Sequence, residues 1–221
     1  MANYKVVHFD KIPSTQTYAR ELILGRHANG RMAIVADVQT AGHGRYRRTW
    51  VSPNGNLYVS FIFQSPDRDS RISYWVAVAV AETLIEFGMQ PQIKWPNDIL
   101  IDGKKISGIL IEYCADFVIV GIGINVASCP NIPEYQTAKC LDYVNVTKND
   151  VFGRLTRNMD KWMRADFSVV RNRWMDLAIG INADVKYQGA MATLIGLNDN
   201  GALVLRRGSK YLMVYGDEIV I

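Results

Sequence analysis

The sequence predicts an α+β protein, with helices packed on a mixed or antiparallel β-sheet and a small separate β-barrel at the C-terminal end. Apolar runs of strand length alternate with turns rich in glycine and proline over the first 126 residues. Apolar residues also recur at helical spacing in three segments. After about residue 182 the composition changes to short strand-like pieces. A chain of 221 residues is long enough for one full domain and a small appendage.

The N-terminal elements are a strand, a helix and two further strands. Residues 6–9 form the first strand, and Ser14 is placed to cap the helix that follows. The apolar runs at residues 32–38 and 57–63 have strand length. The polar, glycine-containing stretch at residues 39–56 separates them, and we expect it to be a long loop.

The middle of the chain predicts a buried helix and a hairpin. Residues 72–87 are apolar on nearly every face, which is typical of a helix buried against a sheet. The apolar runs 99–101 and 106–111 flank Asp102-Gly103, a strong signal for a two-residue hairpin turn. Residues 117–126 add another strand.

The C-terminal part predicts helices and then a separate unit. Residues 150–177 have helical spacing that fits two helices or one kinked helix. We expect one domain over residues 1–180 and a β-barrel over residues 183–221. The strands expected in the barrel are residues 185–187, 192–197, 202–205 and 211–215.

Composition excludes several classes of protein. Lys and Arg number 25 against 21 Asp and Glu, and a formal charge of +4 is too small for a dedicated nucleic-acid coat. Three cysteines without a CxxC pair favour neither a disulfide framework nor a zinc site, and we expect them to be small buried apolar residues. The widely scattered histidines suggest no metal cluster, so no metal-ligating residue is assigned. Since the first residues lack a signal peptide and no apolar run could span a bilayer, we expect a cytoplasmic protein without membrane contact.

The loop over residues 39–50 carries concentrated positive charge. It contains Arg45, Arg47 and Arg48 beside His43, with no acidic residue. Arginine forks match phosphate oxygens, and glycines at positions 42 and 44 permit close backbone approach, so a nucleotide phosphate is a natural ligand. A solvated surface loop and contact with a nucleic-acid backbone remain open alternatives, because each requires only the same residue types.

A second segment combines a lysine, an acid and a glycine. Because side chains alternate along a strand, Lys104 and Lys105 cannot both face inward. A lysine on an otherwise apolar strand needs an anionic partner, either Asp98 or a substrate. Gly108 and the Gly121-Ile122-Gly123 run remove side-chain bulk on two strands, which suggests a slot for a ligand.

Taken in order, these residues resemble the biotin protein ligase family. The resemblance runs from about residue 5 to the C-terminus. Its specific part is Lys94-Trp95-Pro96-Asn97-Asp98 followed by Lys105-Ile106-Ser107-Gly108-Ile109-Leu110, and its weaker parts are Ser14-Thr15-Gln16, Gln39 with Gly42-His43-Gly44-Arg45, and Gly121-Ile122-Gly123-Ile124-Asn125.

The resemblance implies a fold and a set of site residues. The fold is the biotin ligase catalytic domain, similar to class II aminoacyl-tRNA synthetases, followed by an SH3-like barrel. Arg45 and Lys105 would be catalytic. The biotin site would comprise Ser14, Thr15, Gln39, Gly42, His43, Gly44, Lys105 and Gly108. The ATP or adenylate site would comprise Arg45, Arg47, Arg48, Trp50, Asn97, Asp98, Lys105 and Asn125, although Trp50, like Trp75, Trp162 and Trp174, belongs to a residue type that more commonly packs in a core.

The activity implied is activation of biotin with ATP to biotinyl-5'-AMP and pyrophosphate, with Mg²⁺ balancing the phosphate charge. Biotin then passes to a lysine of a biotin carboxyl carrier domain. The sequence departs from the family at His43, where an arginine is usual. We expect no DNA-binding domain, since the catalytic region begins almost at Met1, and a monomer or homodimer. Lipoate protein ligase is the nearest alternative, followed by a non-enzymatic module that binds nucleic acid or a protein partner.

Overall fold

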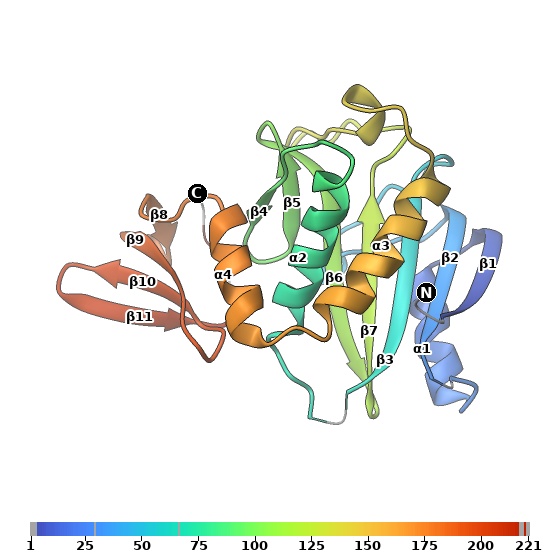
Figure 1. Cartoon of the computed structure of the whole chain (residues 1–221), viewed down its shortest axis with the longest axis horizontal. Helices are drawn as coiled ribbons and strands as arrows, with labels where there is room; N and C mark the ends of the chain where they lie inside the picture. The colour runs from blue at the N-terminus through green and yellow to red at the C-terminus, as the bar shows by residue number, and fades with distance from the viewer. Residues whose placement is uncertain (1–3, 29, 66, 217–218, 220–221) are drawn as a thin grey trace.

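The computed structural model describes residues 4–28, 30–65, 67–216 and 219. A seven-stranded mixed sheet forms its centre, in the order β1-β2-β3-β7-β6-β5-β4 (Figure 1). Only β1 and β2 pair in parallel, and the other neighbours are antiparallel. The strands are β1 Lys5–Ile12, β2 Met32–Gln39, β3 Leu57–Gln64, β4 Gln92–Lys94, β5 Asp98–Ile101, β6 Lys104–Cys114 and β7 Phe117–Ile124.

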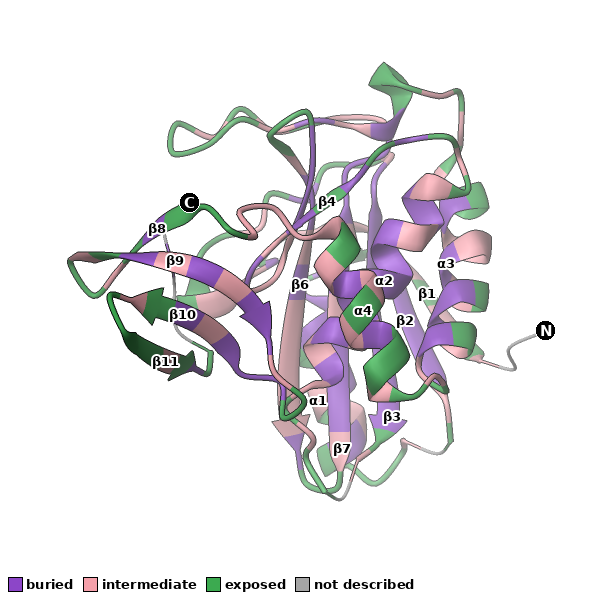
Figure 2. Cartoon of the chain, turned by 60° about the vertical axis from the view of Figure 1, so that its left-hand side comes forward, coloured by how far each residue is buried: buried purple, intermediate pink, exposed green. Residues whose placement is uncertain are grey.

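Helices cover both faces of this sheet. Helix α1, Thr15–Leu24, packs on one face over β2, β3 and β7, where Ala19 and Ile23 meet a small apolar cluster. Helices α2, Ile72–Ile85, and α3, Lys148–Trp162, cover the other face (Figure 1). Most of α2 is buried because it lies between the sheet and helices α3 and α4, as its apolar residues on every side predict (Figure 2).

The expected hairpin and helices are present. Asp102 and Gly103 both have positive φ, at 50° and 73°, as a two-residue hairpin turn requires. Residues 150–177 form two helices, α3 and α4, the latter spanning Phe167–Leu177. No helix of the described residues is long and apolar enough to cross a membrane.

The C-terminal strands form a separate antiparallel sheet in the order β11-β10-β9-β8 (Figure 1). Its strands are β8 Asp184–Tyr187, β9 Ala190–Leu197, β10 Leu203–Arg207 and β11 Lys210–Val214. The expectation of four short strands after residue 182 is therefore confirmed. Closure of this sheet into an SH3-like barrel stays a prediction.

The second sheet is anchored to the helices that pack on the first sheet. Tyr74 of α2 donates a hydrogen bond to the Gly201 carbonyl at 2.8 Å, and Arg171 of α4 donates to the Leu197 carbonyl at 2.7 Å. Met175 fills the space under Gly196, where an added Cβ would come within 2.2 Å of its side chain. The apolar interiors of the two sheets consequently form one continuous cluster.

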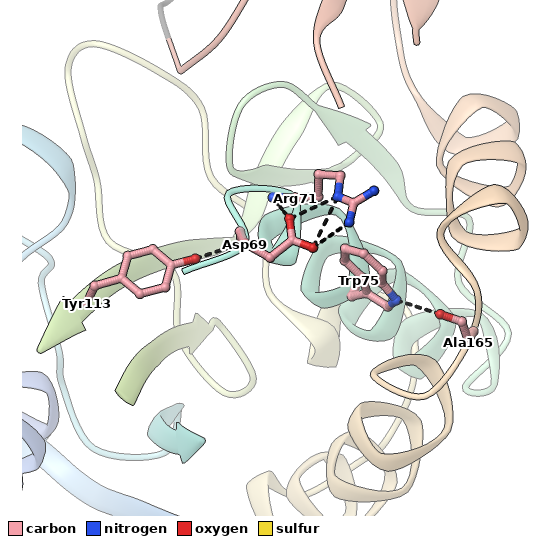
Figure 3. Close-up of polar contacts among 5 residues, drawn as sticks. All are labelled: Asp69, Arg71, Trp75, Tyr113 and Ala165. Carbon is pink, nitrogen blue, oxygen red and sulfur yellow. Dashed lines mark hydrogen bonds and ion pairs between the residues drawn. The ribbon is translucent and has the colours of Figure 1, made fainter. Parts of the chain in front are cut away.

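A polar cluster fixes the start of α2 (Figure 3). The Asp69 carboxylate accepts from Arg71 at 2.7 to 3.1 Å, and Tyr113 of β6 donates to the Asp69 carbonyl at 2.7 Å. Trp75 donates to the Ala165 carbonyl at 2.9 Å, which ties α2 to the turn between α3 and α4. The helix is thereby held to the sheet on one side and to the next helices on the other.

Candidate functional site

A cavity of about 840 Å³ opens beside the N-terminal end of α1. Residues of β3, β5, β6 and β7 form its floor. Two loops form its walls. One is the basic loop, residues 39–50, and the other, which we call the covering loop, is residues 130–138. Ile219 also lines the cavity, so the C-terminal segment reaches the same place.

Two glycines in register form the centre of the floor. Gly108 pairs with Gly123 on one side and with Asp98 on the other, so the three positions face the same way. The Trp50 indole lies directly on both glycines. A Cβ at position 123 would come within 2.5 Å of the ring, and one at position 108 within 2.8 Å. The glycines therefore leave a flat slot, as the sequence predicts, but in this structure the Trp50 ring fills it, and a ligand in the slot stays a prediction.

Polar side chains fix the end of the cavity nearest α1. The backbone N–H and hydroxyl of Thr15 both donate to Gln39 Oε1, at 2.9 and 3.1 Å. Gln39 Nε2 donates to Ser52 Oγ at 3.1 Å, so the orientation of the amide is set from both ends. Ser14 caps α1 and is buried, like Thr15. Such a preordered set of polar groups suits a polar part of a ligand.

Lys105 places an ammonium group at the edge of the glycine slot. Its Nζ lies 2.7 Å from Asp98 Oδ1, and the two side chains are only 15% and 25% exposed. The ring centroids of Trp50 and Tyr135 lie 5.4 and 5.1 Å from the same Nζ. Lys104 is exposed, so the expectation that one lysine of the pair faces the site is confirmed. The partner of Lys105 in this structure is Asp98.

The basic loop folds back on itself as a short hairpin. The Gly44 N–H donates to the Arg48 carbonyl at 2.8 Å, and the Trp50 N–H donates to the Gly42 carbonyl at 2.9 Å. Arg45 Nη2 donates to the Gly216 carbonyl at 2.8 Å, which links the loop to the C-terminal segment. Arg45 Nη1 is buried and has no hydrogen-bond partner among the described residues, so it is available to an anion.

The structure brings most of the expected site residues together. The cavity is lined by Ser14, Thr15, Gln39, His43, Gly44, Arg45, Arg48, Trp50, Asn97, Asp98, Lys105 and Gly108. Three expected residues are not part of this lining. Gly42 packs beneath the loop, where a Cβ would meet Ser52 and Trp50 at 2.7 Å. Arg47 is exposed with a positive φ of 58°, and Asn125 lines a small adjoining pocket instead.

Sequence reasoning missed the covering loop and several buried polar residues. Ile132, Pro133, Glu134, Tyr135 and Gln136 all line the cavity, as do Gln16, Ser60 and Ile219. Gln16 fits its position only because residue 121 is glycine, since a Cβ there would come within 2.6 Å of Gln16 Oε1. The covering loop has no charge cluster or motif in sequence, so only its position after β7 could have indicated it.

The cavity has a positive electrostatic balance. Arg45, Arg48, Lys94 and Lys105 line it, against the carboxylates of Asp98 and Glu134. Burial, followed by the charges of Asp98 and Glu134, raises the pKa of Tyr135, so its phenol stays neutral at physiological pH. A cavity with excess positive charge and an apolar glycine floor suits an anionic ligand that also carries an apolar part.

Other reactive groups lie away from this cavity. Among the described residues, His8, Asp10 and Asp37 have possible metal-ligand atoms within 4.8 Å of one another, a group that the scattered histidines did not suggest. Asp37 already contacts His8 at 2.7 Å and Lys148 at 2.5 Å. Cys114 and Cys140 are free and buried as expected, whereas Cys129 is exposed, contrary to the prediction.

Comparison with known proteins identifies close resemblances. Residues 8–126 match the model of the biotin/lipoate A/B protein ligase family. The bifunctional ligase/repressor BirA of Bacillus subtilis is 33% identical over 97% of this chain and 73% of its own length. The biotin–acetyl-CoA-carboxylase ligase of Mycobacterium tuberculosis is 27% identical over 90% of this chain and 83% of its own.

A solved structure resembles the whole chain. The biotin protein ligase from Aquifex aeolicus, in complex with biotin and ATP, superposes with a TM-score of 0.82 at 26% identity. The match covers 97% of each chain, so it includes both the seven-stranded sheet and the C-terminal sheet.

Proposed function

This chain belongs to the biotin/lipoate A/B protein ligase family and is a biotin protein ligase, and we propose that the cavity carries out both steps of biotin transfer. In the first step, a carboxylate oxygen of biotin attacks the α-phosphorus of ATP, and pyrophosphate leaves. In the second, the ε-amine of a lysine on a biotin carboxyl carrier domain attacks the acyl carbon. AMP leaves, and the amine loses a proton.

The observation that carries this proposal is the place of the Lys105 ammonium. It lies at the edge of the glycine slot, with its Nζ 2.7 Å from the Asp98 carboxylate on the cavity floor. Two anions, a carboxylate and a phosphate, must approach each other in the first step. A fixed ammonium between them stabilises the charge that accumulates, an effect of about 3 to 4 kcal/mol per preorganised donor.

Biotin would occupy the end of the cavity near α1. Ser14, Thr15 and Gln39 supply oriented polar groups there, and Gly108 leaves room for the Trp50 ring, beside which the apolar tail would lie. Gly42, His43 and Gly44 form the adjacent turn of the basic loop. We place the carboxylate of biotin toward Lys105.

The nucleotide would lie between the basic loop and the covering loop. Arg45 supplies the buried Nη1 as a phosphate donor, with Arg48 beside it in the cavity lining. Further adenylate contacts would come from Arg47, Trp50, Asn97, Asp98 and Asn125. Closure of the two loops around the adenylate would keep water from the mixed anhydride.

Mg²⁺ fits the site as an ion held chiefly by substrate phosphates. It commonly binds through one or two carboxylates plus phosphates, and Asp98 has a buried Oδ1 that makes no directed hydrogen bond. When bound, the ion would neutralise phosphate charge. Asp98 would then bind the metal as substrate anions take its place beside Lys105.

The decisive experiment is mass spectrometry of a carboxyl carrier domain incubated with this protein, biotin and MgATP. The expected result is a mass increase of one biotinyl group on one lysine. Lipoate in place of biotin should give no product, and a lipoyl adduct instead would reassign the substrate. No adduct with either acid would remove the proposed activity.

We further infer that the C-terminal sheet closes as an SH3-like barrel, that the protein acts in the cytoplasm as a monomer or homodimer, and that it does not bind DNA. The Bacillus relative is named a repressor as well as a ligase. An electrophoretic shift assay with duplex DNA tests the last point, and a sequence-specific complex would contradict it.

A further inference from the structure

Tyr135 of the covering loop contacts the side chain on which the proposed chemistry depends. Its ring centroid lies 5.1 Å from Lys105 Nζ, and the Trp50 centroid lies 5.4 Å from the same atom. The two aromatic residues come from different loops, one before β3 and one after β7. Both line the main cavity and the small pocket beside it, so the lysine amine lies where the two loops meet.

The covering loop is also attached to the backbone of Lys105. The Lys105 N–H donates to the Gln136 carbonyl at 2.9 Å, and the Ala138 N–H donates to the Lys105 carbonyl at 3.0 Å. Within the loop, Thr137 Oγ1 donates to the Pro130 carbonyl at 2.6 Å. Main-chain and side-chain contacts thus hold Tyr135 close to Lys105, and residues 136–138 are hydrogen-bonded to the backbone of the lysine itself.

The chemistry of the contacts distinguishes them. Asp98 attracts the ammonium as an anion, and it competes directly with substrate anions for the same N–H groups. An aromatic face also attracts a cation, but it accepts no conventional hydrogen bond. Lysine has three N–H donors, so an ammonium held by ring faces keeps them available for a carboxylate and a phosphate. The neutral phenol of Tyr135 adds no negative charge to this environment.

We propose that Tyr135 is a positioning residue for biotin activation, forming with Trp50 an aromatic clamp that holds the Lys105 ammonium over the slot when substrate anions replace Asp98. The proposal rests on the proposed function of the cavity. In this proposal the covering loop acts on the chemical step by positioning Lys105, in addition to any contact that the loop makes with the nucleotide.

The first test compares two replacements of Tyr135 in biotin-dependent ATP–pyrophosphate exchange. Tyr135→Leu keeps much of the bulk but removes the ring, and kcat should fall about 2-fold to 30-fold, the range that one cation–π contact supports. The KM values for biotin and ATP should change by less than about 2-fold, because the contact acts on the transition state. Tyr135→Phe keeps the ring, and its kcat should stay within about 2-fold of the parent value.

Tyr143→Leu is the matched control. Tyr143 is 40% exposed, against 41% for Tyr135, but its hydroxyl contacts Asp102 outside the cavity. The Tyr143→Leu variant should therefore keep the biotin-dependent ATP–pyrophosphate exchange activity of the parent protein. Equal losses in Tyr135→Leu and Tyr135→Phe, or no loss in either, would overturn the clamp.

The second test needs no enzymatic activity. Limiting acetic anhydride is applied to the ligand-free protein, and acetylation of Lys105 is measured by peptide mass spectrometry with the exposed Lys104 as internal reference. The ratio of Lys105 to Lys104 labelling should rise at least about 2-fold in Tyr135→Leu and stay unchanged in Tyr135→Phe. An unchanged ratio in Tyr135→Leu would overturn the clamp. If the parent protein shows no exchange, the proposed function fails, and the labelling ratio still decides the geometry.

Discussion

Replacement of Lys105 separates its role in catalysis from its role in stability. Lys105→Met keeps the length of the side chain and removes the charge. The proposed mechanism then loses a preorganised cation, which corresponds to about 3 to 4 kcal/mol, or roughly 10² to 10³-fold in biotin-dependent ATP–pyrophosphate exchange. Stability should also fall, because Asp98 Oδ1 is left in a mostly buried position without the ammonium 2.7 Å away.

The size of the stability loss follows from the exposure of the pair. Removing one partner of a fully buried ion pair costs about 3 to 5 kcal/mol. Since Lys105 and Asp98 are 15% and 25% exposed, solvent weakens the effect, and we expect about 2 kcal/mol. For a chain of this length that lowers Tm by roughly 4 to 8 °C.

The double variant Lys105→Met/Asp98→Asn makes the test decisive. Neutralising Asp98 should restore most of the lost Tm but none of the lost exchange activity, because the uncompensated charge is gone while the catalytic cation is still missing. Lys104→Ala, which removes the adjacent exposed lysine, should change neither quantity. Recovery of exchange together with Tm in the double variant would refute the catalytic role of Lys105.

Three further predictions concern the basic loop, the glycine slot and the ion pair at the start of α2. Arg45→Gly should still form biotinyl-AMP but release it about 10-fold to 100-fold faster, measured as adenylate retained through gel filtration, since one charge-assisted donor is worth about 1.5 to 3 kcal/mol. Gly123→Ala should displace the Trp50 indole, which an added Cβ would approach to 2.5 Å, and shift its fluorescence, whereas an unchanged spectrum would contradict the contact. The Arg71 guanidinium holds the pKa of Asp69 below its usual value, so the pair stabilises the fold above about pH 4 and the contribution is lost as the pH falls through the lowered pKa. Asp69→Asn should therefore lower the free energy of unfolding by about 0.5 to 1 kcal/mol at pH 7. The difference in unfolding free energy between variant and parent should disappear at a pH below the lowered pKa of Asp69.

Helices, strands and turns could be predicted from local sequence patterns, because the residue types in each element reflect how deeply it is buried and which backbone angles it needs. The all-round apolar character of residues 72–87 follows from burial of α2 under α3 and α4. The Asp102-Gly103 turn is read directly from its need for positive φ. The whole arrangement could not be predicted from such patterns, because the pairing of β3 with β7 joins segments that lie far apart in the sequence.

Site residues could be predicted where a charged residue or a glycine interrupts an otherwise apolar or polar run of the sequence. Arg45, Lys105 and Gly108 all line the cavity, and each stands out in the sequence. The covering loop does not stand out, because its lining residues are ordinary in type and act through position. Likewise, the contact of Arg45 with Gly216 joins residues 171 positions apart, which no local pattern records.

One irregularity of β6 explains how Lys105 and Gly108 reach the same face. In a regular strand, residues three apart point to opposite faces of the sheet. The β5–β6 pairing shifts by one residue between Ile99 and Leu100, because Ser107 pairs with Ile99 whereas Lys105 pairs with Leu100, leaving Ile106 without an opposite residue. This bulge turns Lys105 toward the cavity while Ile106 stays fully buried in the core. The spacing of lysine and glycine in the sequence therefore makes functional sense only with the bulge, which places the ammonium at the edge of the slot that the glycine opens.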